Sequence, residues 1–177
     1  KADAILLIGS NPRWEAAVLN ARIRKAYIEN NCKIGLIGPK SDLNYDYHHL
    51  SDSLDYLNKL SSNKSDFNKV LKSAKNPLII LGTSAINNDH GKKILETAAL
   101  IAKKIQKNKN INPLNILNQD ISRVGALDLK FYNKKFDNDY NKQLKKHIDK
   151  TKPVVFLMGL DEINFSTFEN AFVVYLG

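Results

Sequence analysis

The chain has 177 residues, of which 43% are hydrophobic and 25% are charged, and its formal net charge is +9. This length suits one domain with a sizeable core and is short for two. No apolar run approaches the roughly 20 residues that cross a bilayer, so the sequence offers no membrane-spanning helix. The single cysteine, Cys32, excludes an internal disulfide and any all-cysteine metal or iron–sulfur site within the chain.

The positive charge comes mostly from lysine, because only four of the 27 basic residues are arginine. The lysines are spread along predicted helices and loops, without an interleaved aromatic and basic recognition motif. We therefore expect no nucleic-acid partner, and a nucleotide- or nucleic-acid-binding module is the alternative that charge alone favours. The arginines are expected where a planar, bidentate donor is needed, and at least one of Arg22 and Arg24 should contact a carboxylate or a backbone carbonyl.

The opening stretch predicts a strand, a tight turn and a helix. Residues 4–8 form an apolar run without alternation, which is typical of a strand buried on both faces of a parallel sheet. Asn11 is expected to cap the helix, with Pro12 at its first position. The turn Gly9, Ser10 and Asn11 leaves backbone N–H groups free at a helix N-terminus, close to the carboxyl end of a strand, where anions are favoured. These three residues are the candidate phosphate-binding turn.

The first helix is predicted over residues 12–30, and its broad apolar face should pack onto the sheet. That face contains Trp14, Ala17, Val18 and Ala21, widened by Leu19, Ile23, Ala26 and Tyr27. A second strand over residues 33–38 completes a parallel, right-handed βαβ unit. No G-x-G-x-x-G follows the first strand, and Gly38 stands where a dinucleotide-binding protein carries the acid that holds a ribose.

The rest of the chain continues to alternate between strands and helices. Residues 43–50 are interpreted as a polar, aromatic loop, in which His48 and His49 lack a third ligand, so no metal site is expected. Strands are predicted over residues 76–82, 114–117, 153–159 and 171–177, and helices over 51–60, 65–74 and 90–107, the last capped by Asp89. Residues 119–129 form a short helix or ordered loop, and residues 131–150 a polar loop followed by an exposed helix.

About six strands with helices between them predict an α/β fold. The sheet should be doubly wound and mostly parallel, with helices on both faces, in a three-layer, Rossmann-like single domain over residues 1–177. The chain begins at Lys1 almost directly on a core strand and finishes on a strand that ends in Gly177. We therefore expect a piece of a longer polypeptide, whose exposed edges and apolar surface should make the isolated fragment self-associate.

Several stretches resemble the large iron–sulfur subunit (the 75 kDa subunit) of respiratory NADH:quinone oxidoreductase, in its molybdopterin-oxidoreductase-like region. They are residues 2–16 (ADAILLIGSNPRWEA), 19–25, 35–39, 45–47, 122–128 (SRVGALD) and 174–177. The opening block and the SRVGALD block are specific when they occur together. The resemblance covers nearly the whole chain.

The resemblance implies a non-catalytic, structural domain without catalytic residues, metal or cofactor. In active relatives the turn that matches Gly9, Ser10 and Asn11 helps to bind a guanine dinucleotide, and an Asp follows the second strand, where this chain has Gly38. The turn would therefore be a vestige. The alternative is a fragment of an active molybdopterin guanine dinucleotide oxidoreductase, similar to formate dehydrogenase.

The resemblance also implies a place in a larger enzyme. The parent complex passes electrons from NADH through FMN and iron–sulfur clusters to quinone, with 4Fe-4S and 2Fe-2S clusters expected in the part of the parent chain that precedes this region. The implied partners are other subunits of the peripheral arm, at the cytoplasmic face of a bacterial inner membrane. This domain itself would not insert into the membrane.

Overall fold

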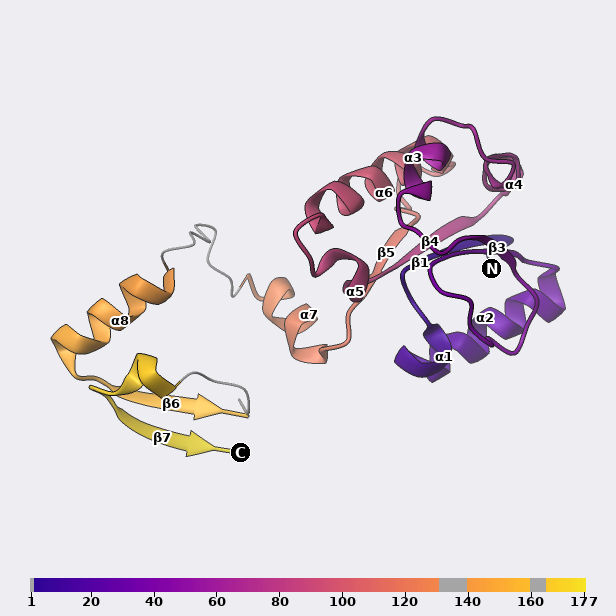
Figure 1. Ribbon diagram of the computed structural model, residues 1–177. Coiled ribbons are helices and arrows are strands. Elements are labelled where there is room, and N and C mark those ends of the chain that lie inside the picture. Colours follow the sequence, from indigo (N-terminus) through magenta and orange to yellow (C-terminus); the bar gives the residue numbers. More distant parts are fainter. Residues whose placement is uncertain (1, 131–139, 160–164) are drawn as a thin grey trace. The chain divides into compact units, whose positions relative to one another are not determined.

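Figure 1 shows the computed structural model, which describes residues 2–130, 140–159 and 165–177. The chain divides into two compact units, Lys1–Gly125 and Ala126–Gly177, here called unit 1 and unit 2. The expectation that residues 1–177 behave as one domain stays a prediction. The polar loop expected from residue 131 onward lies outside the described residues as far as residue 139. None of the described helices has the length and hydropathy of a membrane span.

Unit 1 is built on five parallel strands in the order β3-β2-β1-β4-β5. They are β1 (Ala4–Ile8), β2 (Lys33–Ile37), β3 (His48–Ser51), β4 (Pro77–Gly82) and β5 (Leu114–Leu117). Every residue of β1 is buried, because β2 and β4 pair with its two edges and helices cover both faces. The predicted α/β class, with a parallel sheet between two helical layers, is confirmed.

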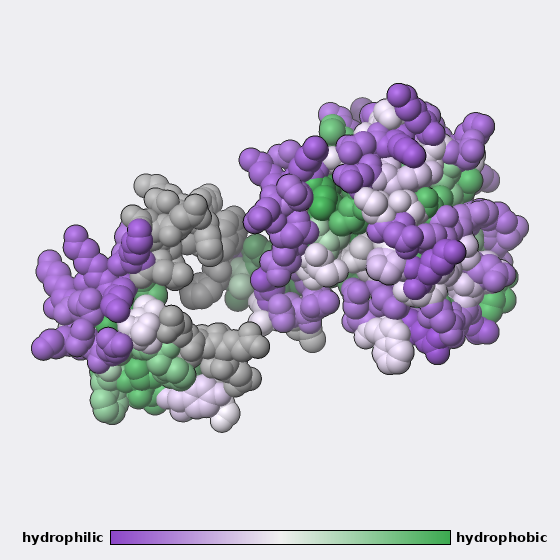
Figure 2. Space-filling view, in the orientation of Figure 1, coloured by the Kyte–Doolittle hydropathy of each residue, from purple (hydrophilic) through white to green (hydrophobic). Residues whose placement is uncertain are grey.

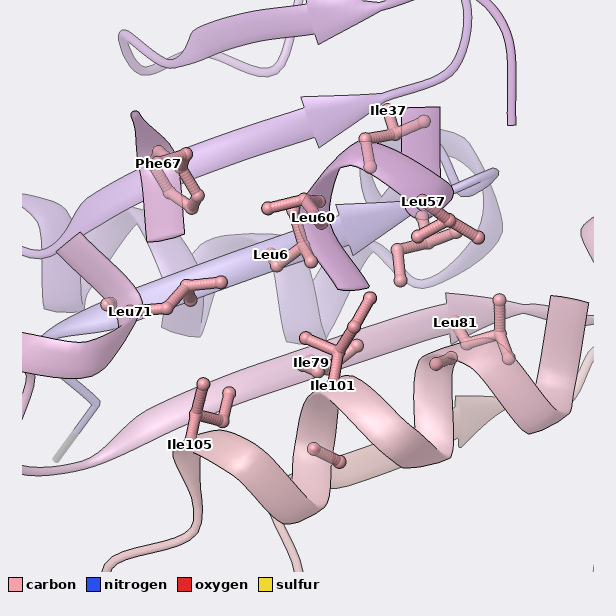
Figure 3. Close-up of a cluster of buried hydrophobic side chains, with 14 of the residues drawn as sticks. Leu6, Ile37, Leu57, Leu60, Phe67, Leu71, Ile79, Leu81, Ile101 and Ile105 are labelled. Atoms are coloured by element: carbon pink, nitrogen blue, oxygen red, sulfur yellow. The ribbon is translucent and has the colours of Figure 1, made fainter. Parts of the chain in front are cut away.

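The two helical layers bury alternate residues of the central strand. Leu6 and Ile8 face the layer that contains α3, α4 and α6, whereas Ile5 and Leu7 face the layer that contains α2. Figure 3 shows the first of these cores, where Leu60 approaches Leu6. The helices of unit 1 are α1 (Pro12–Glu15), α2 (Ala17–Asn30), α3 (Tyr56–Ser61), α4 (Phe67–Ser73), α5 (Thr83–Ile86) and α6 (Gly91–Ile105), and α7 (Ile121–Asp128) spans the boundary with unit 2.

In unit 1, the first helix and the loop over residues 43–50 differ from the sequence-based expectation, and His90, not Asp89, is the N-cap residue of α6. The helix predicted over residues 12–30 is interrupted at Ala16, whose backbone (φ −155°, ψ 71°) separates α1 from α2. The predicted loop over residues 43–50 contains the start of a strand, β3, which pairs with β2 at the edge of the sheet. An edge strand is only half covered, so it can contain polar residues such as His48 and His49. Because of these polar residues, the apolar pattern of the sequence does not predict the strand.

The apolar face predicted for the first helix is only partly correct. Ile23, which is 3% exposed, packs on the sheet together with Leu19, Ala26 and Tyr27. The other predicted set lies in solvent instead, with Trp14 81% and Val18 76% exposed and Ala17 and Ala21 not buried either. A helix on the outside of a sheet has one inner face, and the apolar residues of α1 and α2 are too widely spread to share it.

One side chain ties the two central strands together at their start. The Asp3 carboxylate, just before β1, accepts the backbone N–H groups of Lys75 (2.7 Å) and Asn76 (2.8 Å), just before β4. Burial alone would raise the pKa of Asp3, but these N–H groups outweigh it and the pKa lies below its ordinary value. The ionised side chain is therefore part of the link between the strands.

We expect Asp3→Asn to lower the free energy of unfolding by about 1 kcal/mol at neutral pH, because the amide offers one oxygen where the carboxylate offers two. A carboxyl whose pKa is lowered by folding stabilises above its unfolded pKa, near 3.8, and loses that contribution as the pH falls through the folded value. Urea unfolding should therefore give free energies of unfolding for wild type and variant that converge below about pH 4. Asp66→Asn, at a fully exposed carboxylate, is the control. A difference in the free energy of unfolding between wild type and Asp3→Asn that stays constant with pH would contradict the prediction.

Unit 2 contains a second, smaller sheet. Strands β6 (Val154–Met158) and β7 (Phe172–Leu176) pair in parallel with each other, whereas the sequence pattern placed them in the same sheet as the others. Helix α8 (Tyr140–Thr151) precedes β6, and a short 3-10 helix, η1 (Phe165–Phe168), precedes β7. Ile148 and Leu157 are the buried apolar side chains of the described part of unit 2.

This small sheet also carries apolar side chains that are exposed. On β6 they are Val154 (56%), Phe156 (58%) and Met158 (72%), and on β7 Phe172 (70%) and Leu176 (52%). Figure 2 shows hydrophobic residues gathered over these strands. Parallel sheets are normally covered on both faces, and a two-stranded sheet is marginal on its own. The exposed apolar side chains of β6 and β7 therefore favour association with other protein.

We expect the isolated chain to form dimers or larger species at high concentration through the exposed side chains of β6 and β7. Phe156→Ser combined with Phe172→Ser should shift the population toward monomer, whereas Leu100→Ser, at a 56%-exposed position on α6, should not. Multi-angle light scattering over a concentration series measures both effects. A wild-type chain that is strictly monomeric at every concentration would contradict this expectation.

Candidate functional site

The candidate site is a cleft of about 430 Å³ at the carboxyl ends of β1, β2 and β4. In a doubly wound sheet the connections after β1 and β4 leave in opposite directions, which opens a crevice between them. The predicted turn lies here, since Gly9, Ser10 and Asn11 all line the cleft. Ser84, at the start of α5, lines the side that follows β4.

The turn after β1 is packed tightly against its neighbours. Gly9 has a positive φ of 52°, and a Cβ there would lie 2.5 Å from the Ala85 Cβ. The Gly9 N–H donates to the Ile37 carbonyl (2.8 Å), and the Gly9 carbonyl accepts the Ser84 hydroxyl (2.9 Å). A Cβ on Gly82 would come within 2.2 Å of that carbonyl oxygen. Both backbone polar groups of Gly9 are therefore used inside the protein.

A carboxylate of the chain itself accepts two further donors of the turn. The Asn11 N–H donates to Glu15 Oε1 (2.8 Å), and the Ser10 hydroxyl donates to Glu15 Oε2 (3.2 Å). A helix N-terminus favours a negative charge, and here Glu15 supplies it. Asn11 does not cap α1 through its side chain, contrary to the sequence-based expectation, and its Oδ1 is buried without a hydrogen-bond partner among the described residues. The capping role belongs to Glu15, four residues further along the chain.

The position after β2 closes the other side of the cleft. Gly38 has φ 137°, in the region that favours glycine; its N–H donates to the Ser51 carbonyl (2.8 Å) and its carbonyl oxygen lies 3.0 Å from His49 Nε2. Position 38 itself carries no acid, but Asp52 brings a carboxylate to the same cleft, 3.3 Å from His49 Nε2. Sequence reasoning did not find Asp52 because it did not recognise β3, the strand that Asp52 follows.

The charges of the cleft are negative. Glu15 and Asp52 contribute carboxylates, and none of the described residues that line it is Lys or Arg. Two unit charges 4 Å apart interact by about 1 kcal/mol in water and about 4 kcal/mol near a protein surface. A phosphate placed on this turn would meet the Glu15 carboxylate at the Asn11 N–H and the Ser10 hydroxyl. The cleft is therefore poorly suited to a nucleoside diphosphate.

The arginines of the first helices hold the loop between β2 and β3. Arg13 forms an ion pair with Asp42, and Arg24 Nε donates to the Asn44 carbonyl (3.2 Å), which confirms the expected backbone-carbonyl contact. The backbone N–H of Asn44 and, after it, the Arg13 guanidinium keep the pKa of Asp42 below its ordinary value. Arg13 is therefore directed away from the turn and does not provide a cation for it.

The remaining candidate ligands do not converge. His48 and His49 are successive residues of a strand, so they leave opposite faces: the His48 ring lies 6.0 Å from the Phe67 ring, and His49 reaches Gly38. Within the described ranges no three His, Cys, Asp or Glu side chains form a group that could hold a metal ion. Cys32 is buried, and burial raises the pKa of its thiol to about 11, so the thiol stays protonated.

Comparison with known proteins gives the family. The chain is 38% identical over 183 residues to the mitochondrial NADH dehydrogenase (ubiquinone) iron-sulfur protein 1 of Solanum tuberosum. It is 37% identical to the NADH-ubiquinone oxidoreductase 75 kDa subunit of Reclinomonas americana over 183 residues, and 37% identical to the mitochondrial 78 kDa subunit of Neurospora crassa over 181.

These alignments take in 99 to 100% of the chain and 23 to 25% of each relative, so the chain spans about a quarter of the length of the relatives it matches. The resemblance drawn from the sequence is thereby confirmed. The family model for molybdopterin oxidoreductases matches residues 1–177. The chain therefore belongs to the molybdopterin oxidoreductase family.

Proposed function

We propose that this chain is a structural domain of the iron–sulfur subunit of an NADH:quinone oxidoreductase and performs no chemistry itself. The observation that carries the proposal is the Glu15 carboxylate, which accepts the Asn11 N–H and the Ser10 hydroxyl in the turn where a cofactor phosphate would bind. Similarity along the whole chain to subunits of that name supports the assignment of the parent enzyme.

In this proposal the parent enzyme carries electrons from NADH through FMN and iron–sulfur clusters to quinone. The 4Fe-4S and 2Fe-2S clusters belong to the part of the parent chain that precedes this region, and this domain holds no cofactor. Its sheet, buried on both faces in unit 1, supplies a frame against which other parts of the enzyme pack. In this role the domain supports electron transfer by holding other parts of the enzyme in place and by stabilising the assembly.

We also propose where the domain acts. Its partners are other subunits of the peripheral arm, and the complex sits at the cytoplasmic face of a bacterial inner membrane. The net charge of +9 supports acidic protein neighbours. The competing assignment, a working molybdopterin guanine dinucleotide oxidoreductase, requires a phosphate site at Gly9 and a sugar-binding acid at position 38, where this chain has glycine.

The direct test of the proposal is cofactor analysis. The 177-residue chain, purified from a host that makes molybdopterin, should be colourless, contain no stoichiometric molybdenum, iron or pterin, and oxidise neither NADH nor formate. Elemental analysis and a pterin fluorescence assay measure the content. Near-stoichiometric molybdenum or pterin would favour the competing enzyme and reject the structural role.

The role of Glu15 can be tested separately. Glu15→Ala should lower the free energy of unfolding by about 1 to 2 kcal/mol, because it leaves the Asn11 N–H and the Ser10 hydroxyl without their acceptor. Excess inorganic phosphate should restore part of this loss in the variant and leave wild type unchanged. Glu29→Ala, which removes only an exposed i,i+4 ion pair with Lys25, is the control. Wild type that phosphate stabilises as much as the variant would show that Glu15 does not block the turn.

A further inference from the structure

The first two helices expose an apolar stripe on the side that faces away from the sheet. Its members, here called the α2 stripe, are Trp14, Ala17, Val18, Ala21 and Ile28. Trp14 is 81%, Val18 76% and Ile28 60% exposed. Ile23 and its neighbours already fill the inner face of α2, so the residues of the α2 stripe are not part of the core of unit 1.

The spacing of the α2 stripe fits a helix as its neighbour. Within α2, Ala17, Ala21 and Ile28 lie four and seven residues apart, which places them on one face at the spacing of a seam between two packed helices. Trp14 belongs to α1, before the break at Ala16. The small side chains of Ala17 and Ala21 let a second backbone approach closely, and Trp14 at one end offers a large anchor. The 14 residues of α2 make a contact about 21 Å long.

The charges beside the α2 stripe are mostly positive. Arg22 and Arg24 flank it, and Lys25 lies on the same side of α2, four residues after Ala21. Glu29, the nearby acid, lies 3.7 Å from Lys25. Arg22 is exposed and has no hydrogen-bond or ion-pair partner among the residues that the structure describes. A second copy of the same stripe would bring like charges together, whereas a helix with acidic flanks would neutralise Arg22.

We infer that the α2 stripe is a docking surface for an amphipathic helix with acidic flanks on another subunit of the parent complex. The inference rests on the proposed function, because it takes the partner from that complex. The apolar side chains of the partner cover Val18 and Trp14, and its carboxylates meet Arg22. Burial of the stripe in the complex removes the exposed apolar surface that the isolated chain retains.

The first arm of the test uses the 177-residue chain. Val18→Glu places a charge at the middle of the α2 stripe, and Leu100→Glu, at a 56%-exposed position of α6, is the matched control. Since both side chains are exposed, both variants should keep the wild-type circular dichroism and melt within about 2 °C of wild type. Neither should change self-association. If Val18→Glu alone unfolds the chain, or alone abolishes its dimers, the stripe serves the chain itself or a second copy and the inference is wrong.

The second arm introduces the same changes into the full-length parent subunit, and native gels stained for NADH dehydrogenase activity measure the assembled complex. Val18→Glu should lower assembled complex by about tenfold or more, and Leu100→Glu should leave it at the wild-type level. Arg22→Glu should lower assembly as well, whereas Lys92→Glu, an exposed lysine of α6, should not. Normal assembly with Val18→Glu would overturn the inference while leaving the proposed function intact. A wild-type subunit that enters no such complex would reject the proposed function, and the inference with it.

The chemistry of the partner is tested by crosslinking in the purified complex. A photoreactive benzoylphenylalanine at position 18 should attach to a helical, acidic segment of another subunit, identified by mass spectrometry. Attachment to the parent chain itself, or to a basic segment, would overturn the inference.

Discussion

The complete burial of β1 is the constraint on which the rest of unit 1 depends. With neighbours on both edges and helices on both faces, its five residues must all be apolar, and the chain must leave the sheet through a turn at the centre of the carboxyl edge. At Gly9 this turn has no room for a side chain, since a Cβ there would collide with Ala85. The location of the cleft, and the close packing around it, follow from the position of this strand.

The same turn shows how a side chain of the chain itself can bind at a helix N-terminus where anions are favoured. Backbone donors at a helix N-terminus must be satisfied by some acceptor, whether a ligand, water or a side chain. Here the Glu15 carboxylate accepts the Ser10 hydroxyl and the Asn11 N–H, which is an internal capping interaction. Asp52 adds a second negative charge to the cleft. The cleft has the geometry of an α/β crevice, and the charged side chains that line it are negative among the described residues.

The chain buries part of its apolar surface and leaves another part exposed to solvent. Unit 1 buries the central strands of its sheet on both faces, yet the outer side of α2 and the strands β6 and β7 keep large apolar side chains in solvent. Exposed apolar patches on this scale are typical of surfaces that meet other protein. A structural domain of a larger assembly would need such surfaces, because it acts through its contacts with neighbouring proteins.

Local patterns in the sequence determined the parts of the structure that depend on local physics. The unbroken apolar runs at β1 and β4, the turn at Gly9 and the period of α6 each specify an element directly, and together they predict the parallel α/β sheet and the place of its cleft. Tertiary structure alone decided the rest. The helical period of residues 12–30 gives one broad apolar face but does not reveal the break at Ala16 or which half of that face the sheet covers. Likewise β3 is a strand because β2 offers it an open edge, and the Glu15 carboxylate reaches the turn because α1 ends where it does; both outcomes depend on groups that meet only after the chain has folded.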